Sequence, residues 1–257
     1  MEGENIKRTL QKFLARVPVL YRAILLVLGR GSVEKRLYLS LIRKGNTVFD
    51  IGANQGYFTI LFSDLVGANG RVHAFEPVPS TFARLSHAVE AAGCENVTVS
   101  QLALGEIEEK SSIFVPGDDG GQAAFVRHQH GSWEKADVQE CVVEVIRLDD
   151  YASEFSRIDF IKCDVEGAEL LVLKGGANVL RRCRPILFLE NDDRWMIDFG
   201  WSSNSVLQWL QEIGYSYFYS VGAVVEPLQQ ANNGGEALLC GFEEIKGICR
   251  AIKVEPF

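Results

Sequence analysis

The repeated order of short apolar strands and amphipathic helices constrains the fold of this chain more than any other feature. Strands that alternate with helices form a mostly parallel sheet with helices on both faces. The last two predicted strands are expected to pair antiparallel. The sequence therefore predicts an α/β fold with a seven-stranded, mostly parallel sheet, whose strands lie at residues 47–51, 71–76, 96–102, 158–164, 186–190, 215–221 and 237–242. Helices are predicted at residues 57–65, 80–92, 168–181 and 205–213.

Two segments depart from this order. Residues 1–44 are predicted to be helical and to precede a main domain at residues 45–257. Within that domain, strands at 111–115 and 140–148 flank a polar insertion at 116–137 that is rich in Gly, Asp and His. Loops of this length inside a compact domain are commonly functional. We expect the N-terminal helices and the insertion to form a cover over a site, or a surface for a partner.

Charge and cysteine content narrow the functional classes. The formal net charge of −8 disfavours nucleic acid as a partner, although residues 1–45 hold ten Lys or Arg against three Glu. The apolar stretch at 17–28 is too short to span a bilayer, so it is either a packed helix or a helix in weak contact with a membrane surface. The six cysteines form no C-x-x-C pair, which favours reduced thiols and a cytoplasmic protein.

Acidic residues and glycines follow five of the predicted strands, at the edge where parallel sheets bind ligands. The first such loop, residues 50–56 (DIGANQG), lacks the phosphate-binding patterns G-x-G-x-x-G and G-x-x-x-x-G-K-[ST]. Asp50 would repel a pyrophosphate but suits an ammonium group. Glu76 ends the second strand about 20 residues after Gly56, where an acid binds both ribose hydroxyls. An amino-acid loop and a ribose acid together indicate S-adenosylmethionine (SAM).

Three motifs carry a resemblance to a known family. Residues 48–59 (VFDIGANQGYFT) resemble motif I of class I methyltransferases, and residues 73–77 (HAFEP) resemble their second motif. Residues 161–169 (IKCDVEGAE) look like the K-x-D-x-E-G-x-E motif of the FkbM family, which consists mostly of O-methyltransferases. The resemblance covers residues 45–222 and implies a class I methyltransferase fold.

The resemblance also implies roles for single residues. Gly52, Asn54 and Gly56 would flank the methionine part of SAM, with Asp50 near its ammonium group. Glu76, followed by the family's proline at Pro77, would hold the ribose. Ala103 and Leu104 would contact adenine, with Gln101 as a weaker candidate, and Asp164 would face the methyl sulfonium.

The acceptor's proton requires a base near Asp164. The catalytic candidates are Asp164, Glu166, Glu190 and Lys162, where the lysine is either a base or half of a buried ion pair. Asp164, Glu190 and Asn191 could hold Mg²⁺ or Ca²⁺, but we favour a site without metal. Glu169, Asp192 and Asp193 lie near these candidates in the sequence, and each of them has either a catalytic or a structural role. His128 and His130 in the insertion are expected to be solvated rather than catalytic.

These features favour a SAM-dependent O-methyltransferase that acts on a hydroxyl of a sugar, polyketide or other secondary metabolite. The alternatives are a SAM-dependent N-methyltransferase and a non-catalytic SAM-binding protein. The intact loop at residues 50–56 and the presence of Glu76 argue against the non-catalytic alternative. The sequence does not specify the acceptor or the oligomeric state.

Overall fold

A computed structural model describes residues 33–117, 122–129, 133–134, 136–228 and 237–245. Helix α3 (Val33–Leu41) is the described part of the predicted N-terminal helical segment, and residues 1–32 lie outside the described residues. No helix in the described ranges combines the length and the apolar character needed to cross a bilayer.

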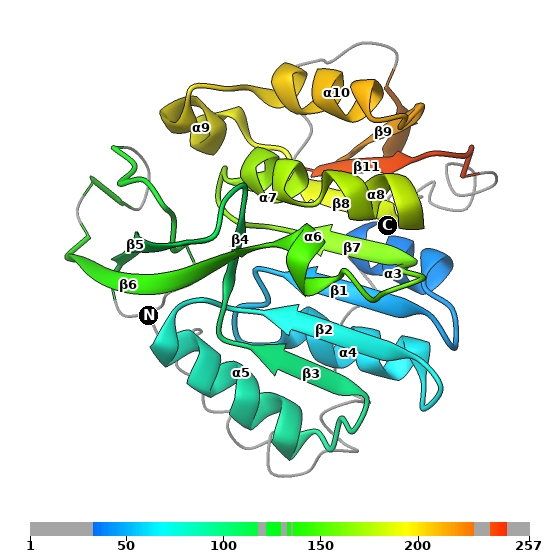
Figure 1. The fold of residues 1–257 in the computed structure, drawn as a ribbon, viewed down its shortest axis with the longest axis horizontal. Helices are drawn as coiled ribbons and strands as arrows, with labels where there is room; N and C mark the ends of the chain where they lie inside the picture. Colours follow the sequence, from blue (N-terminus) through cyan, green and yellow to red (C-terminus); the bar gives the residue numbers. More distant parts are fainter. Residues whose placement is uncertain (1–32, 118–121, 130–132, 135, 229–236, 246–257) are drawn as a thin grey trace.

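The main sheet contains the seven predicted strands and one short additional strand, in the order β10-β9-β11-β8-β7-β1-β2-β3 (Figure 1). Strands β3, β2, β1, β7 and β8 are parallel to one another, whereas β11 is antiparallel to both β8 and β9. The predicted antiparallel final pair is thus confirmed. The bounds are β1 (Thr47–Ile51), β2 (Arg71–Phe75), β3 (Val97–Ser100), β7 (Phe160–Cys163), β8 (Ile186–Glu190), β9 (Tyr217–Val221), β10 (Val225–Pro227) and β11 (Ala237–Gly241).

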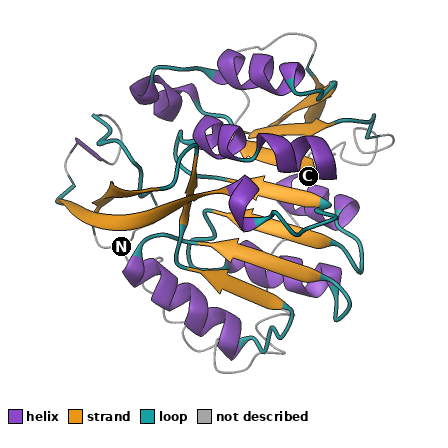
Figure 2. Cartoon of the chain, in the orientation of Figure 1, coloured by secondary structure: helices purple, strands orange, loops and turns teal. Residues whose placement is uncertain are grey.

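Helices cover both faces of this sheet because neighbouring residues on a strand point to opposite faces (Figure 2). Val48 of β1 belongs to the core cluster with α3 and α4 (Tyr57–Val66), and helix α5 (Pro79–Ala91) packs on the same side against α4. Phe49 faces the opposite core, which is formed with α6 (Leu148–Tyr151), α7 (Glu169–Gly175), α8 (Ala177–Cys183) and α10 (Ser203–Glu212).

The helix predicted at residues 168–181 is two helices, α7 and α8, which meet at Gly176. The short elements between β8 and α10 were not predicted. Helix α9 (Asp193–Met196) and the 3₁₀ helix η3 (Ile197–Phe199) follow β8 and lead to α10. They place a compact turn beside the end of the sheet, next to the loop that follows β7.

A second sheet with the order β4-β6-β5 projects from the carboxyl edge of the main sheet (Figure 1). It consists of β4 (Ala103–Gly105), β5 (Glu109–Pro116) and β6 (Val138–Arg147). The described part of the insertion folds back on this sheet, because the backbone of Ala124 pairs with Phe114 and Trp133 is buried. The described residues of the insertion therefore pack against the second sheet.

Candidate functional site

A cavity of about 380 Å³ lies where the carboxyl ends of β1, β2 and β7 meet the second sheet. Its walls come from the loop after β1, the residues after β2, the start of β4 and the loop after β7. The described part of the insertion supplies the remaining wall through Ala123, Ala124 and Phe125. Parallel sheets bind ligands at this edge, so the cavity occupies the position predicted for the cofactor. Of the predicted residues, it is lined by Gly52, Asn54, Glu76, Pro77, Ala103, Leu104, Lys162, Asp164 and Glu166.

The loop after β1 packs tightly against the end of β7. Gly52 has a φ of +77°, and a Cβ atom at this position would lie 1.9 Å from the carbonyl oxygen of Asp164. Only glycine accommodates both the backbone conformation and the close approach. Gly56 precedes α4 and is absent from the described lining of the cavity. Gly52 therefore fixes the distance between the loop and Asp164.

Glu76 is held by backbone donors at the end of β2. Its Oε2 accepts a hydrogen bond from the N–H of Asn54 (3.0 Å), and its Oε1 accepts one from the N–H of Val78 (3.0 Å). Burial raises the pKa of Glu76 to about 7, although both hydrogen bonds act in the opposite direction. Each carboxylate oxygen keeps a free acceptor position, so the side chain can bind two neighbouring hydroxyl groups.

Asp50 lies behind the cavity wall. It is completely buried, its Oδ2 accepts a hydrogen bond from the Thr59 hydroxyl (2.6 Å), and it does not line the cavity. Its Oδ1 lies 3.9 Å from Nζ of Lys162, the residue opposite Asp50 in the pairing of β1 with β7. Asp50 is inside the strand rather than beyond its end, so its predicted place near the methionine ammonium group would be behind the cavity wall, where its charge is shared with Lys162.

Lys162 forms a buried ion pair. Its Nζ donates to Oδ2 of Asp164 (2.9 Å), and the side chain is 3% exposed. Burial alone lowers the pKa of Lys162, but the carboxylates of Asp164 and Asp50 outweigh this effect and leave the pKa above its usual value. This geometry favours the ion pair over a lysine base, since the amine keeps its proton.

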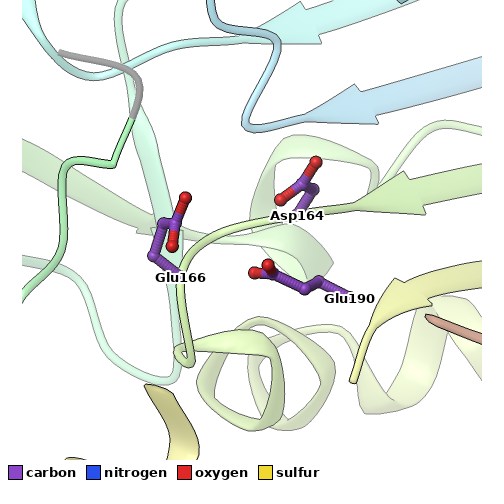
Figure 3. Close-up of side chains that lie close together, drawn as sticks. All are labelled: Asp164, Glu166 and Glu190. Atoms are coloured by element: carbon purple, nitrogen blue, oxygen red, sulfur yellow. The ribbon is translucent and has the colours of Figure 1, made fainter. Parts of the chain in front are cut away.

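Three carboxylates gather at the ends of β7 and β8. Ligand atoms of Asp164, Glu166 and Glu190 all lie within 4.8 Å of one another (Figure 3). Burial, followed by the charge of Asp164, raises the pKa of both Glu166 and Glu190. The pKa rises to about 8 for Glu166 and to about 10 for Glu190, so Glu166 is better suited than Glu190 to accept a proton near neutral pH.

The backbone at Glu166 has a left-handed φ of 54°, which is unfavourable for a glutamate. The following residue, Gly167, packs against the carbonyl oxygen of Trp195 in α9. Such local strain is often found at functional sites. Here the strained turn presents the Glu166 carboxylate to Asp164 and Glu190 in one cluster.

The same three carboxylates also fit the oxygen ligands that Mg²⁺ or Ca²⁺ prefers. The Oδ1 of Asn191 is buried and has no hydrogen-bond partner among the described residues, so it is an additional oxygen donor beside Glu190. However, Lys162 already places an ammonium group on Asp164. Lys162 therefore already neutralises part of the charge that a metal ion would meet in this cluster.

The other acidic candidates have structural contacts. The buried carboxylate of Glu169 accepts a hydrogen bond from the N–H of Val165 (2.9 Å) and braces the turn after β7. Asp192 caps α9 by accepting the N–H of Arg194, and Asp193 accepts the N–H of Ser203 at the start of α10. We therefore place these three residues in the support of the site. The weaker adenine candidate, Gln101, is exposed and does not line the cavity.

His128 corrects one expectation about the insertion. The residue is 2% exposed rather than solvated, its Nδ1 lies 2.6 Å from Oδ2 of Asp198, and its ring packs against Trp133 and Trp195. This contact joins the insertion to η3, an element that was not predicted. Trp133 in a polar segment was the sequence signal of a buried contact. His130 lies outside the described residues.

Comparison with known proteins places this fold in a family. The domain described as the methyltransferase FkbM domain matches residues 50–217. The chain belongs to the FkbM methyltransferase domain family. The matched FkbM segment contains both the cavity loop after β1 and the carboxylate cluster.

Two curated relatives and one solved structure extend the comparison. This FkbM-family chain is 31% identical over 159 residues to the 31-O-demethyl-FK506 methyltransferase FkbM of Streptomyces tacrolimicus, covering 52% of the chain and 60% of that protein. It is 29% identical over 143 residues to Methyltransferase 1 of Beauveria bassiana, covering 50% and 57%, respectively. The chain thus spans less than two thirds of the length of either relative.

The crystal structure of methyltransferase FkbM from Methylobacillus flagellatus superposes with a TM-score of 0.50 at 16% identity, covering 79% of this chain and 47% of that one. This similarity concerns the fold. The class I methyltransferase fold predicted from the sequence is confirmed.

Proposed function

We propose that this FkbM-family chain is a SAM-dependent O-methyltransferase that methylates a hydroxyl of a sugar, polyketide or other secondary metabolite. The observation that carries the proposal is the position of the cavity between a ribose-binding carboxylate, Glu76, and a carboxylate cluster at Asp164. The name of the Streptomyces tacrolimicus relative, a 31-O-demethyl-FK506 methyltransferase, supports a hydroxyl acceptor.

The cofactor would occupy the cavity in a single orientation. Glu76 accepts the ribose hydroxyls, and the residues after β3, Ala103 and Leu104, contact the adenine. The loop at Gly52 and Asn54 surrounds the methionine part, and Asp164 stands at the reacting end. SAM supplies a methyl group that is activated for displacement by its sulfonium.

The protein's chemical task is to align the acceptor and remove its proton. Lys162 keeps Asp164 in place through the buried ion pair. Glu166, whose pKa is raised to about 8 by burial and by Asp164, is the group of the cluster best suited to receive the hydroxyl proton. The described insertion residues Ala123–Phe125 exclude water from the opposite side of the cavity.

The proposal is tested by the release of S-adenosylhomocysteine from SAM with a panel of glycosides and polyketide alcohols. Asp164→Asn should lower turnover by about two orders of magnitude or more, within the range for acid–base groups, and should leave S-adenosylhomocysteine binding intact. Asp150→Asn, an exposed carboxylate on α6, is the matched control and should retain full turnover. Wild-type turnover by Asp164→Asn would contradict the assignment.

The same assay, run with a chelator, distinguishes a cluster that acts without a metal ion from a cluster that binds one. Without a metal, a chelator leaves turnover unchanged, which is the result we expect. Loss of turnover with chelator and recovery with Mg²⁺ would instead assign the cluster to a cation. Methylation of amines but no alcohols would contradict O-methylation.

A further inference from the structure

A second cavity, of about 500 Å³, lies on the other side of Asp164. It is bounded by α3, by the carboxyl end of β8 and by the β9–β11 side of the main sheet. Asp164 lines both this cavity and the first one, whereas Glu34 and Glu190 line only the second. The described lining comprises Val33, Glu34, Asp164, Phe188, Glu190, Val221, Gly222, Ala223 and Ala237. A molecule in the second cavity would therefore meet the cofactor at Asp164.

The position of Glu34 is fixed by packing. Its Oε1 accepts a hydrogen bond from the Tyr38 hydroxyl at 2.5 Å. The Tyr38 ring is fully buried and makes edge-to-face contacts with aromatic side chains of α4, β7 and β8. These contacts attach α3 to the sheet, so the Glu34 carboxylate stays at the mouth of the second cavity.

The second cavity concentrates carboxyl groups, and burial raises the pKa of Glu34 and Glu190, so an ammonium group bound there would favour their ionised forms. Three of its described lining residues are acidic and none is cationic. Lys162 already pairs with Asp164 and lies near Asp50. Glu190 has an Oε2 atom without a hydrogen-bond partner among the described residues. Because Glu34 and Glu190 do not line the first cavity, a cofactor bound there does not contact them.

The apolar residues of the second cavity indicate that its ligand also has an apolar part. Val33, Phe188, Val221 and Ala237 offer carbon surfaces on the walls between the carboxylates. A ligand that fits this lining combines an apolar part with a positive charge, because an ammonium group can pair with carboxyl groups that have no cation among the described lining residues.

We propose that the second cavity binds the methyl acceptor, and that this acceptor carries an ammonium group close to the hydroxyl that is methylated. The inference rests on the proposed function. The ammonium group pairs with Glu34 and Glu190, which brings the hydroxyl to Asp164. The hydroxyl oxygen forms the new O–C bond, the C–S bond of the sulfonium breaks with its electron pair left on sulfur, and the hydroxyl proton passes to a carboxylate of the cluster.

The test compares two probes that differ in one group, hexyl 2-amino-2-deoxyglucoside and hexyl glucoside. Both are titrated calorimetrically into the full chain loaded with S-adenosylhomocysteine. The aminated glycoside should bind at least about tenfold more tightly, since a rigidly held carboxylate pair discriminates strongly for charge. The combined variant Glu34→Gln/Glu190→Gln should lose this preference, and Glu212→Gln, an exposed glutamate on α10, should keep it.

A third variant tests the positioning of Glu34. Tyr38→Phe keeps the aromatic packing and removes the hydrogen bond to Glu34, so it should reduce the preference for the aminated probe without abolishing it. S-adenosylhomocysteine affinity, measured for every variant, reports whether the fold and the first cavity are intact.

Equal affinity for the two probes would overturn the inference, and so would the absence of binding by either at millimolar concentration. A preference that survives in the combined variant would overturn it as well. If S-adenosylhomocysteine still binds the wild-type protein, each of these results contradicts the inference about the acceptor but not the proposed function. Failure of S-adenosylhomocysteine to bind wild-type protein would instead contradict the proposed function itself.

Discussion

At the scale of single residues, the Glu76 carboxylate accepts two backbone N–H groups while it is almost entirely buried. Its pKa is raised to about 7 by burial. The side chain is thus largely protonated below this pH and ionised above it. Because the ionised form accepts two hydroxyl hydrogen bonds and the protonated form accepts fewer, ribose binding should strengthen as the pH rises through about 7.

The measurement uses 5′-methylthioadenosine, which contains the ribose and adenine but no amino-acid group to titrate. Its affinity should rise by up to about tenfold between roughly pH 6 and pH 8, the change expected when one ionised carboxylate is required. Glu76→Gln should bind more weakly by about 1–3 kcal/mol, the sum of two hydrogen bonds, with no dependence on pH in this range. A pH-dependent affinity that persists in Glu76→Gln would contradict this explanation.

Single residues also show where prediction from the sequence reaches its limit. Glu76 and Asp164 follow the ends of β2 and β7, and both line the cavity as expected. Asp50 lies one residue earlier in its strand, so its side chain points between β1 and α4 and meets Thr59. The bounds of β1 were predicted correctly at 47–51, but the sequence does not show which face of the strand turns toward the cavity, and Asp50 lies on the face that packs against α4.

At the scale of elements, α7 comes unusually close to the second sheet. A Cβ atom on Gly175 would lie 1.9 Å from the carbonyl oxygen of Gly105, at the end of β4. Gly176, where α7 ends and α8 begins, packs against the side chain of Leu148 in α6. Gly175 therefore sets how closely α7 approaches the strand whose start, at Ala103 and Leu104, lines the first cavity.

Gly175→Ala should lower the free energy of unfolding by about 1–3 kcal/mol or more, because the added methyl group pushes against backbone atoms that cannot rotate away. Denaturant titration measures this loss. Gly222→Ala is the stability control, since no atom lies within 4 Å of a Cβ built at that position. Its free energy of unfolding should change by no more than about 0.5 kcal/mol. Equal free energies of unfolding for the two variants would show that α7 can move away from β4 without loss of stability.

The elements predicted correctly from the sequence are those with a clear apolar period. The strands of the main sheet and helices α4, α5 and α10 belong to this group. Helix α9 and η3 are too short for any period, so their packing on His128 depends on contacts between distant segments. The same reason explains why Glu34 was not a candidate residue: α3 reaches the site by docking Tyr38 on the sheet.

At the scale of the whole molecule, the first cavity lies between two sheets and has walls from both. A ligand that fills it should tie the second sheet and the insertion to the main sheet. S-adenosylhomocysteine at about one hundred times its dissociation constant should stabilise the chain by about 2.7 kcal/mol, which corresponds to a rise in Tm of about 5–10 °C at this size.

Thermal unfolding and limited proteolysis check this expectation together. The ligand should also slow cleavage within residues 116–137, because Ala123–Phe125 contribute to the cavity wall. Glu76→Gln, at the same ligand concentration, should show a smaller rise in Tm. An insertion that is cleaved at the same rate with and without ligand would show that it does not close over the cofactor.

The position of β11 in the sheet has a consequence for the synthesis of the chain. Strands β8 and β9 leave the ribosome before β11 (Ala237–Gly241), although β11 is the strand that lies between them in the sheet. Until β11 emerges, β8 and β9 both face a gap with unpaired N–H and C=O groups, and β11 itself is completely buried in the finished fold. Exposed strand edges are templates for pairing with other chains. The nascent protein is therefore most prone to aggregate in this late interval, when a chaperone that binds extended apolar segments would protect it most.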